Sequence, residues 1–187
     1  MRFMLISGSI SSSSHTRELM NSLAQNLTSL EHEVDIWDFQ TSQLPIAQPE
    51  FHWAPEQNPD GAVQRFYDSV RRADGLAIGS PLYHGSYSGV LKNALDHLWY
   101  DAFRNKPVGL LSHGSSIRLC AQPCEHLQTI IRTLYGHPLQ THVATTKTDY
   151  ELVGGQPHLI SPEILRRVER LALEMIALVP PLKALVF

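Results

Sequence analysis

Short apolar runs alternate along this chain with longer segments in which apolar residues recur every three or four positions. The runs occupy residues 2–7, 33–39, 75–80, 107–112 and 141–146, and most of them end in Ser, Gly or Thr. Runs of this length, bounded by turn residues, are typical of buried strands. Strands that alternate with helices form a parallel sheet whose crossover helices cover both faces. We therefore predict an α/β fold built on a five-stranded parallel sheet.

Five helical segments are predicted between and after these strands, each from an apolar stripe with helical spacing. Ser161 followed by Pro162 is typical of a helix start, and we expect the last helix to begin there. We expect Pro180 and Pro181 to end it, because proline has no backbone N–H to donate. The five stripes are Leu19, Leu23, Leu27 and Leu30; Val63, Phe66, Tyr67 and Val70; Leu91, Leu95 and Leu98; Leu127, Ile130, Ile131 and Leu134; and Ile164, Val168, Leu171, Met175 and Leu178.

The composition excludes several classes of function. The chain has 187 residues, 43% of them hydrophobic, which suits one domain with a substantial core over residues 1–187. The net charge of -3 indicates no basic surface for nucleic acid, and no apolar window reaches the length of a membrane span. Cys120 and Cys124 lack the second pair that a zinc site would need. We expect a cytoplasmic protein with no metal site and no nucleic-acid or membrane partner.

A serine-rich segment, "GSISSSSHT", joins the first predicted strand to the first predicted helix. A helix that begins near Thr16 leaves unpaired N–H groups and the positive end of its dipole at this loop, which suits a phosphate group. The loop lacks the glycines of the dinucleotide and P-loop motifs, so a monophosphate is favoured over a pyrophosphate. The alternative is that residues 11–14 form only a flexible turn and a helix N-cap.

Two further polar loops, "SPLYHGSYSG" and "SHGSSIR", follow the third and fourth predicted strands. Ligands of parallel sheets bind beyond the carboxyl ends of the strands, where all three loops lie. Tyr83 and His84 follow Pro81, so an aromatic and a polar ring stand on a rigid turn that could contact a flat heterocycle. The segment "GSYSG" places Tyr87 where the GxSxG motif of serine hydrolases requires serine, which argues against that class.

At these loops the chain resembles the NADPH-dependent FMN reductase family, which has a flavodoxin-like fold. The family's first loop reads roughly GSxRxxSxT, its second reads PxYxGSxxGxLKNAxD, and the likeness covers most of residues 1–140. The matching residues are Gly8, Ser9, Ser14 and Thr16 in the first loop and Pro81, Tyr83, Gly85, Ser86, Gly89, Leu91, Lys92, Asn93, Ala94 and Asp96 in the second.

The resemblance implies a three-layer sandwich with strand order 2-1-3-4-5, and an enzyme that passes hydride from NADPH to FMN and on to free flavin, a quinone or an azo compound. It implies a homodimer or homotetramer. Because the chemistry belongs to the cofactor, we assign no catalytic side chain. The residues expected to bind FMN are Ser9, Ser11, Ser14, His15 and Thr16 at the phosphate; Pro81, Leu82, Tyr83, His84, Gly85 and Ser86 along the isoalloxazine; and Ser112, His113, Gly114 and Ser115 on its other side.

The chain departs from the family pattern in its first loop. Ser11 stands where the family usually has arginine, so a permanently charged contact is missing, and Arg17 or Arg118 is a candidate to replace it. His84 stands where many members have Asn, and His113 where many have Gly. These two rings either influence which acceptor fits above the flavin or are solvated loop residues.

Two expectations concern other parts of the chain. Trp99, Tyr100 and Phe103 follow the third helical stripe and predict an oligomer interface. Pro123 lies between Cys120 and Cys124 and is expected to interrupt a helix there, which argues against a dithiol relay.

The alternative function is a flavodoxin-like electron carrier without reductase activity of its own, although a net charge of -3 gives little sign of the charged docking face that a carrier needs.

Overall fold

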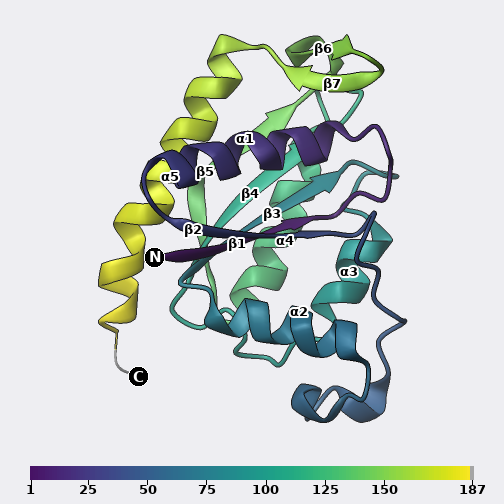
Figure 1. Cartoon of the computed structure of the whole chain (residues 1–187), viewed down its shortest axis with the longest axis vertical. Helices are drawn as coiled ribbons and strands as arrows, with labels where there is room; N and C mark the ends of the chain where they lie inside the picture. Colours follow the sequence, from purple (N-terminus) through teal and green to yellow (C-terminus); the bar gives the residue numbers. More distant parts are fainter. Residues whose placement is uncertain (186–187) are drawn as a thin grey trace.

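A parallel five-stranded sheet forms the centre of the computed structural model, which describes residues 1–185 (Figure 1). Its strand order is β2-β1-β3-β4-β5, and every neighbouring pair is parallel. This confirms the predicted flavodoxin-like architecture. The strands are β1 (Arg2–Ser7), β2 (Glu33–Asp38), β3 (Gly75–Pro81), β4 (Pro107–His113) and β5 (His137–Thr145).

Helices cover both faces of the sheet, which gives the three layers expected from the alternating pattern (Figure 1). One face packs against α1 and α5, which also contact each other, and the other face packs against α2, α3 and α4. The helices are α1 (His15–Ser29), α2 (Gly61–Arg72), α3 (Gly89–Leu95), α4 (Gln122–Thr133) and α5 (Pro162–Lys183).

Strand β1 shows why the strands read as continuous apolar runs. Phe3 and Leu5 belong to the core under α1 and α5, whereas Met4 and Ile6 belong to the core under the other helices. Successive side chains of a strand point to opposite faces, so a strand covered on both sides needs apolar residues at every position. All four side chains are at most 1% exposed.

Prolines account for two differences between the predicted and observed elements. Strand β5 begins at His137 rather than residue 141, and Pro138 lies inside it. This strand is at the edge of the sheet, where a missing N–H is tolerated. Helix α5 continues through Pro180 and Pro181 to Lys183, so the expected stop was wrong. The two prolines lie close to the end of the helix, so the two hydrogen bonds that they remove are followed by only a short stretch of helix.

A β-hairpin after β5 was not predicted. It consists of β6 (Tyr150–Val153) and β7 (Gln156–Leu159), which are antiparallel. Gly154 and Gly155 form its two-residue turn with φ of 60° and 80°, values that favour glycine. Two glycines between short runs are a hairpin signal, so the sequence did contain the information. The hairpin packs against α1.

The long segment between β2 and α2 is held against α3. The Asn93 side chain accepts a hydrogen bond from the backbone N–H of Ala47 (2.9 Å) and donates one to the carbonyl of Pro45 (2.8 Å). The segment also contains two short 3-10 turns at Pro49–Phe51 and Pro55–Gln57.

Within residues 1–185, no helix has the length and apolar character needed to cross a membrane.

Gly8 allows the loop after β1 to lie directly on β3, and this close approach gives a stability prediction. A Cβ on Gly8 would lie 2.8 Å from the carbonyl oxygen of Gly79, a backbone atom that cannot move away. We expect Gly8→Ala to lower the free energy of unfolding by about 1–3 kcal/mol, the usual effect of overpacking, as measured by urea denaturation.

Gly89→Ala is the matched control, because a Cβ on Gly89 would meet no atom of the described residues within 4 Å and the position does not have a positive φ. This change should leave the free energy of unfolding within about 1 kcal/mol of the parent or raise it. Equal unfolding midpoints for the two variants would contradict the steric argument.

Candidate functional site

The three predicted loops meet at one cavity of about 240 Å³ beyond the carboxyl ends of β1, β3 and β4. We call it the polar cavity. The start of α1 lies at the same end of the sheet as the carboxyl end of β3 (Figure 1). Ligand sites of parallel sheets are found at this end. The residues that line the polar cavity are Ser9, Ser11, Ser13, Ser14, His15, Thr16, Pro81, Leu82, Tyr83, His113, Gly114 and Ser115.

Most of the predicted site residues line this cavity, but His84, Gly85, Ser86 and Ser112 do not. Ser112 is fully buried, and its hydroxyl donates to the carbonyl of Cys120. This hydrogen bond fixes the loop after β4 to the buried end of the strand. Ser13 lines the cavity although it was not singled out. It belongs to the same serine run, whose individual members cannot be distinguished by spacing alone.

Hydrogen bonds hold the serine-rich loop in place. Ser14 is the N-cap of α1, and its Oγ accepts the backbone N–H of Arg17 at 3.1 Å. The Oγ of Ser9 accepts the N–H of Ser11 at 3.3 Å, and Ser13 donates to the carbonyl of Gly155 at 2.9 Å. The N-cap alternative is therefore correct for Ser14. It is compatible with a phosphate site, because the capped helix places its first-turn N–H groups beside the cavity.

Neither arginine proposed to replace the missing cation lines the polar cavity. Arg17 forms an ion pair with Asp38, with Nη2 2.9 Å from Oδ1 and Nε on the other carboxylate oxygen. Its Nη1 also donates to the carbonyl of Ser11 at 2.9 Å. Arg118 is exposed on the loop after β4. Within the part of the chain that the structure describes, the residues that line the cavity include no lysine and no arginine.

His15 and His113 form a stacked pair in the cavity wall. Their ring centroids are 4.2 Å apart and the rings are 6° from parallel. Tyr150 packs edge-on against both rings. Burial, with a smaller effect from the neighbouring His15, lowers the pKa of His113 to about 4. Burial and the nearby Lys147 lower the pKa of His15 as well. His113 is thus a packed residue and not a solvated loop residue.

Residues 83–86 form a tight turn at the rim of the cavity. Tyr83 and Ser86 exchange backbone hydrogen bonds of 2.9 and 3.0 Å. The two central residues, His84 and Gly85, have φ of 48° and 81°. Positive φ at both positions defines a type I′ turn, in which Asn-Gly is the preferred pair. His84 therefore occupies a position whose backbone conformation favours asparagine, and its exposed side chain is not part of the cavity lining.

The two cysteines are buried and unpaired with each other. The expectation that Pro123 interrupts a helix was wrong. Helix α4 begins at Gln122, and Pro123 lies in its first turn, where proline is tolerated. The Cys124 thiol donates to the Ser112 hydroxyl at 3.3 Å, and burial raises its pKa to about 12. A thiol that stays protonated is a poor nucleophile.

No group of three or more His, Cys, Asp or Glu that could hold a metal ion occurs among residues 1–185.

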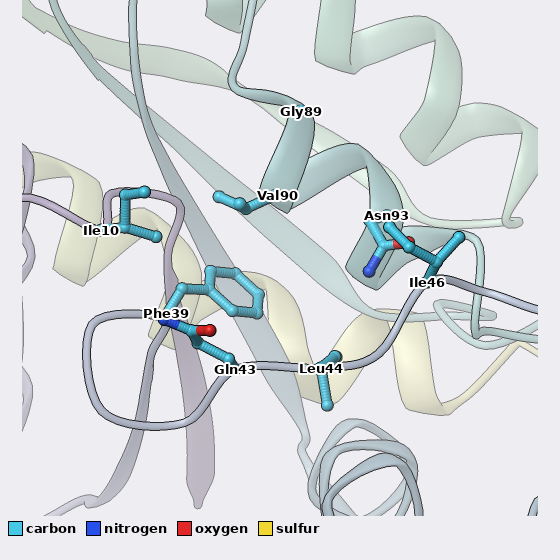
Figure 2. Close-up of a pocket in the computed structure, with 8 residues that line it drawn as sticks. All are labelled: Ile10, Phe39, Gln43, Leu44, Ile46, Gly89, Val90 and Asn93. Carbon is cyan, nitrogen blue, oxygen red and sulfur yellow. The ribbon is translucent and has the colours of Figure 1, made fainter.

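A second pocket, of about 220 Å³, is also lined by the serine-rich loop (Figure 2). Ile10 lines this apolar pocket, whereas its neighbours Ser9 and Ser11 line the polar cavity. Figure 2 shows Ile10, Phe39 and Val90 gathered around one space. The pocket was not predicted, because its apolar side chains come from three separate segments. Its lining is completed by Gln43, Leu44, Ile46, Gly89 and Asn93.

Comparison with known sequences assigns the family. The family model of NADPH-dependent FMN reductases matches residues 1–149. The chain belongs to this family. It is 35% identical over 178 residues to the FMN-dependent NADPH-azoreductase of Staphylococcus saprophyticus, with 94% of this chain and 93% of the relative covered. The relative from Staphylococcus aureus strain USA300, with the same name, is 37% identical over 153 residues, which cover 80% of this chain and 79% of the relative.

A solved structure of another flavoenzyme has the same fold as this chain. A crystal structure of an NADH:FMN oxidoreductase in its apo form superposes with a TM-score of 0.75 at 19% identity and covers 95% of this chain and 89% of its own. Sequence identity at this level supports the fold alone.

The type I′ turn gives a prediction that separates backbone from side-chain effects at His84. Histidine and asparagine adopt positive φ more readily than alanine does. We expect His84→Asn to keep the free energy of unfolding within about 0.5 kcal/mol of the parent, and His84→Ala to lower it by about 1–2 kcal/mol. Thermal or urea unfolding measures both. If the two variants were equally stable, the conformation of the turn would not be the constraint on this position.

Proposed function

We propose that this chain is a single domain that binds FMN in the polar cavity and oxidises NADPH to reduce a small acceptor. The observation that supports this most directly is the convergence of the three loops that carry the family motifs on one cavity. The first-turn N–H groups of α1 suit the phosphate, and a flat ring would extend toward Tyr83 and Gly114. When bound, FMN supplies the two-electron chemistry, and the protein contributes position and electrostatics.

The hydroxyl protons of the serine-rich loop fit a phosphate group. Ser9 and Ser14 are 3% and 6% exposed, and each Oγ already accepts a backbone N–H. A hydroxyl that accepts still has one proton to donate. Neither proton has an acceptor among the hydrogen bonds of residues 1–185, whereas Ser11 and Ser13 donate to backbone carbonyls. Two buried donors without acceptors beside a helix N-terminus are what an anion would satisfy.

The walls for the ring come from the loops after β3 and β4. Leu82 donates its N–H to the carbonyl of His113 at 2.7 Å, and Gly114 donates to the carbonyl of Thr145 at 3.0 Å. The first bond joins the loop after β3 to the end of β4, and the second joins the loop after β4 to the end of β5. Tyr83 is half exposed at the rim, so one aromatic face is available to a planar ligand. No side chain in the cavity is assigned a proton-transfer role in the reaction.

We propose azo compounds as acceptors, with free flavin and quinones as further candidates, because the relatives quoted above are named azoreductases. We also propose a cytoplasmic location, which two buried, unpaired cysteines support. The alternative, an electron carrier with the same fold, would need a strongly charged docking face. A net charge of -3 over 187 residues does not favour one.

Anaerobic titration tests this function. NADPH added to FMN-loaded protein should bleach the flavin absorbance, and an azo dye, a quinone or free FMN added next should restore it. Riboflavin should bind at least about tenfold more weakly than FMN, because it lacks the phosphate and its charge-assisted hydrogen bonds. A flavin that NADPH leaves oxidised but that a reduced partner protein bleaches would identify a carrier. Equal affinity for FMN and riboflavin would contradict the phosphate site.

Assembly is proposed from a strip of aromatic rings on the surface. Trp53 contacts Trp99, which contacts Tyr100, and this ring in turn contacts Tyr135, all edge-to-face. Trp53 is 75% exposed and Tyr135 is 52% exposed. Phe103, also expected on this surface, is fully buried in the core instead. Aromatic side chains are enriched at interfaces, so we propose that the strip joins copies of this chain in a homodimer or homotetramer.

Light scattering should give at least twice the 21.0 kDa mass of one chain at micromolar concentration. Trp53→Ser should shift the protein toward the monomer, because it removes an exposed aromatic ring from the strip. Leu152→Ser, on an exposed hairpin strand away from the strip, is the control and should leave the mass unchanged. A monomeric parent protein would contradict the proposed assembly.

A further inference from the structure

The polar cavity lacks a permanent positive charge for the ligand that it is proposed to hold. A phosphate monoester carries a charge between about −1.5 and −2 at neutral pH. The lining residues among those described include no lysine or arginine, and Arg17 is paired with Asp38. Apart from Tyr83, the titratable residues of the lining are His15 and His113. This inference rests on the proposed binding of FMN.

The hydrogen bonds around His113 define where its proton lies in the neutral state. Thr145 donates its hydroxyl proton to the carbonyl of Ser112 at 3.1 Å, so its oxygen acts as an acceptor toward the ring. We therefore assign the proton of the neutral ring to the Nδ1 of His113, which lies 3.2 Å from this oxygen and donates to it. The Nε2 of the neutral ring then has a lone pair. A lone pair cannot donate to a phosphate oxygen, so His113 contributes to anion binding only after it gains a proton.

The stacked geometry limits the pair to one added proton. The ring centroids are 4.2 Å apart, and two imidazolium ions at this distance would repel each other. His15 is the first residue of α1, where the helix dipole disfavours a cation until an anion is bound. His15 is also the less buried of the two rings. The geometry points to one shared positive charge, carried mainly by His15.

We propose that binding of the FMN phosphate drives uptake of one proton by the His15–His113 pair, which then supplies the cation that the family arginine would provide at position 11. The proton comes from solvent, and no bond other than N–H is made or broken. A bound dianion favours the charged form of a neighbouring imidazole, and such pairing shifts a pKa by about 1–3 units.

Several charged groups face the pair from the elements packed against it. Lys147, in the 3-10 turn after β5, disfavours protonation of both rings, whereas Asp149 in the same turn favours it at His113. Glu18 lies on α1 itself and accepts a hydrogen bond from the N–H of Leu159. Tyr150 stays protonated, because burial raises its pKa well above neutrality. These groups leave the free pair neutral at pH 7, so a proton must arrive with the anion.

The affinity for FMN is expected to depend on pH, because the histidine pair changes its protonation state on binding. In the free protein the pKa of His15 is below 6.5 and that of His113 is about 4. Phosphate binding raises the pKa of the pair, so FMN binds more tightly at low pH, and the affinity falls as pH rises through the raised value. Between pH 6.5 and 8.5 the phosphate itself is mostly a dianion, since its second pKa is about 6. Over this interval we expect the affinity for FMN to fall about five- to tenfold.

Fluorescence titrations with FMN and riboflavin from pH 6.5 to 8.5 test the proposal directly. The affinity for riboflavin should not change over this range, because riboflavin carries no phosphate. Calorimetry at pH 7 in two buffers of different ionisation enthalpy should show uptake of about half to one proton per FMN bound. FMN affinity that is independent of pH, with no proton uptake, would overturn the inference and leave the proposed function intact. Absence of FMN binding would overturn both.

Variants then assign the proton to the pair. His15→Asn should weaken FMN binding at pH 6.5 and remove its pH dependence, while unchanged riboflavin affinity shows that the cavity is intact. Adding Ser11→Arg to His15→Asn should restore tight FMN binding without restoring the pH dependence. Ser12→Arg in the same background is the matched control, because Ser12 is exposed and does not line the cavity. Equal rescue by both arginines, or an unchanged pH slope in His15→Asn, would overturn the assignment.

Discussion

The contact between Gly8 and β3 is the constraint on which the polar cavity depends. The N–H of Gly8 donates to the carbonyl of Gly79 at 2.8 Å, and the carbonyl of Gly8 accepts the hydroxyl of Ser88 at 2.6 Å. Ser88 is also the N-cap of α3, so Gly8 joins the loop after β1 both to β3 and to the helix that follows it. These bonds are buried, where breaking one leaves an unpaired polar group. The serine-rich loop and the Tyr83 turn are therefore positioned together.

The fold could be predicted from the sequence to the extent that its signals are local. A strand covered on both faces must be apolar throughout, so runs such as that of β1 stand out. The start of β5 was placed too late because Pro138 lies inside it. A proline indicates the end of a strand unless the strand is known to be at the edge of the sheet. Pro180 concealed the end of α5 for a similar reason. The effect of a proline depends on which donors the surrounding structure needs, and that is a tertiary property.

The site was predictable as a set of loops but not as a set of contacts. The motifs located the loops correctly, because strand topology brings the carboxyl ends of β1, β3 and β4 together. The stacking of His15 on His113, the pairing of Arg17 with Asp38 and the burial of Ser112 depend on side-chain directions that sequence spacing does not encode. For His84 a local signal existed, since His-Gly in a two-residue turn indicates a positive φ.

The hairpin that follows β5 lies outside the family match, which ends at residue 149, yet it contacts the loop that carries the first family motif. Ser13 donates to its turn at Gly155, and Tyr150 at its start packs against both rings of the histidine pair. These ten residues thus help to hold the wall of the polar cavity from outside the family match. A substitution within the hairpin would disturb that wall while every residue of the family motifs stayed the same.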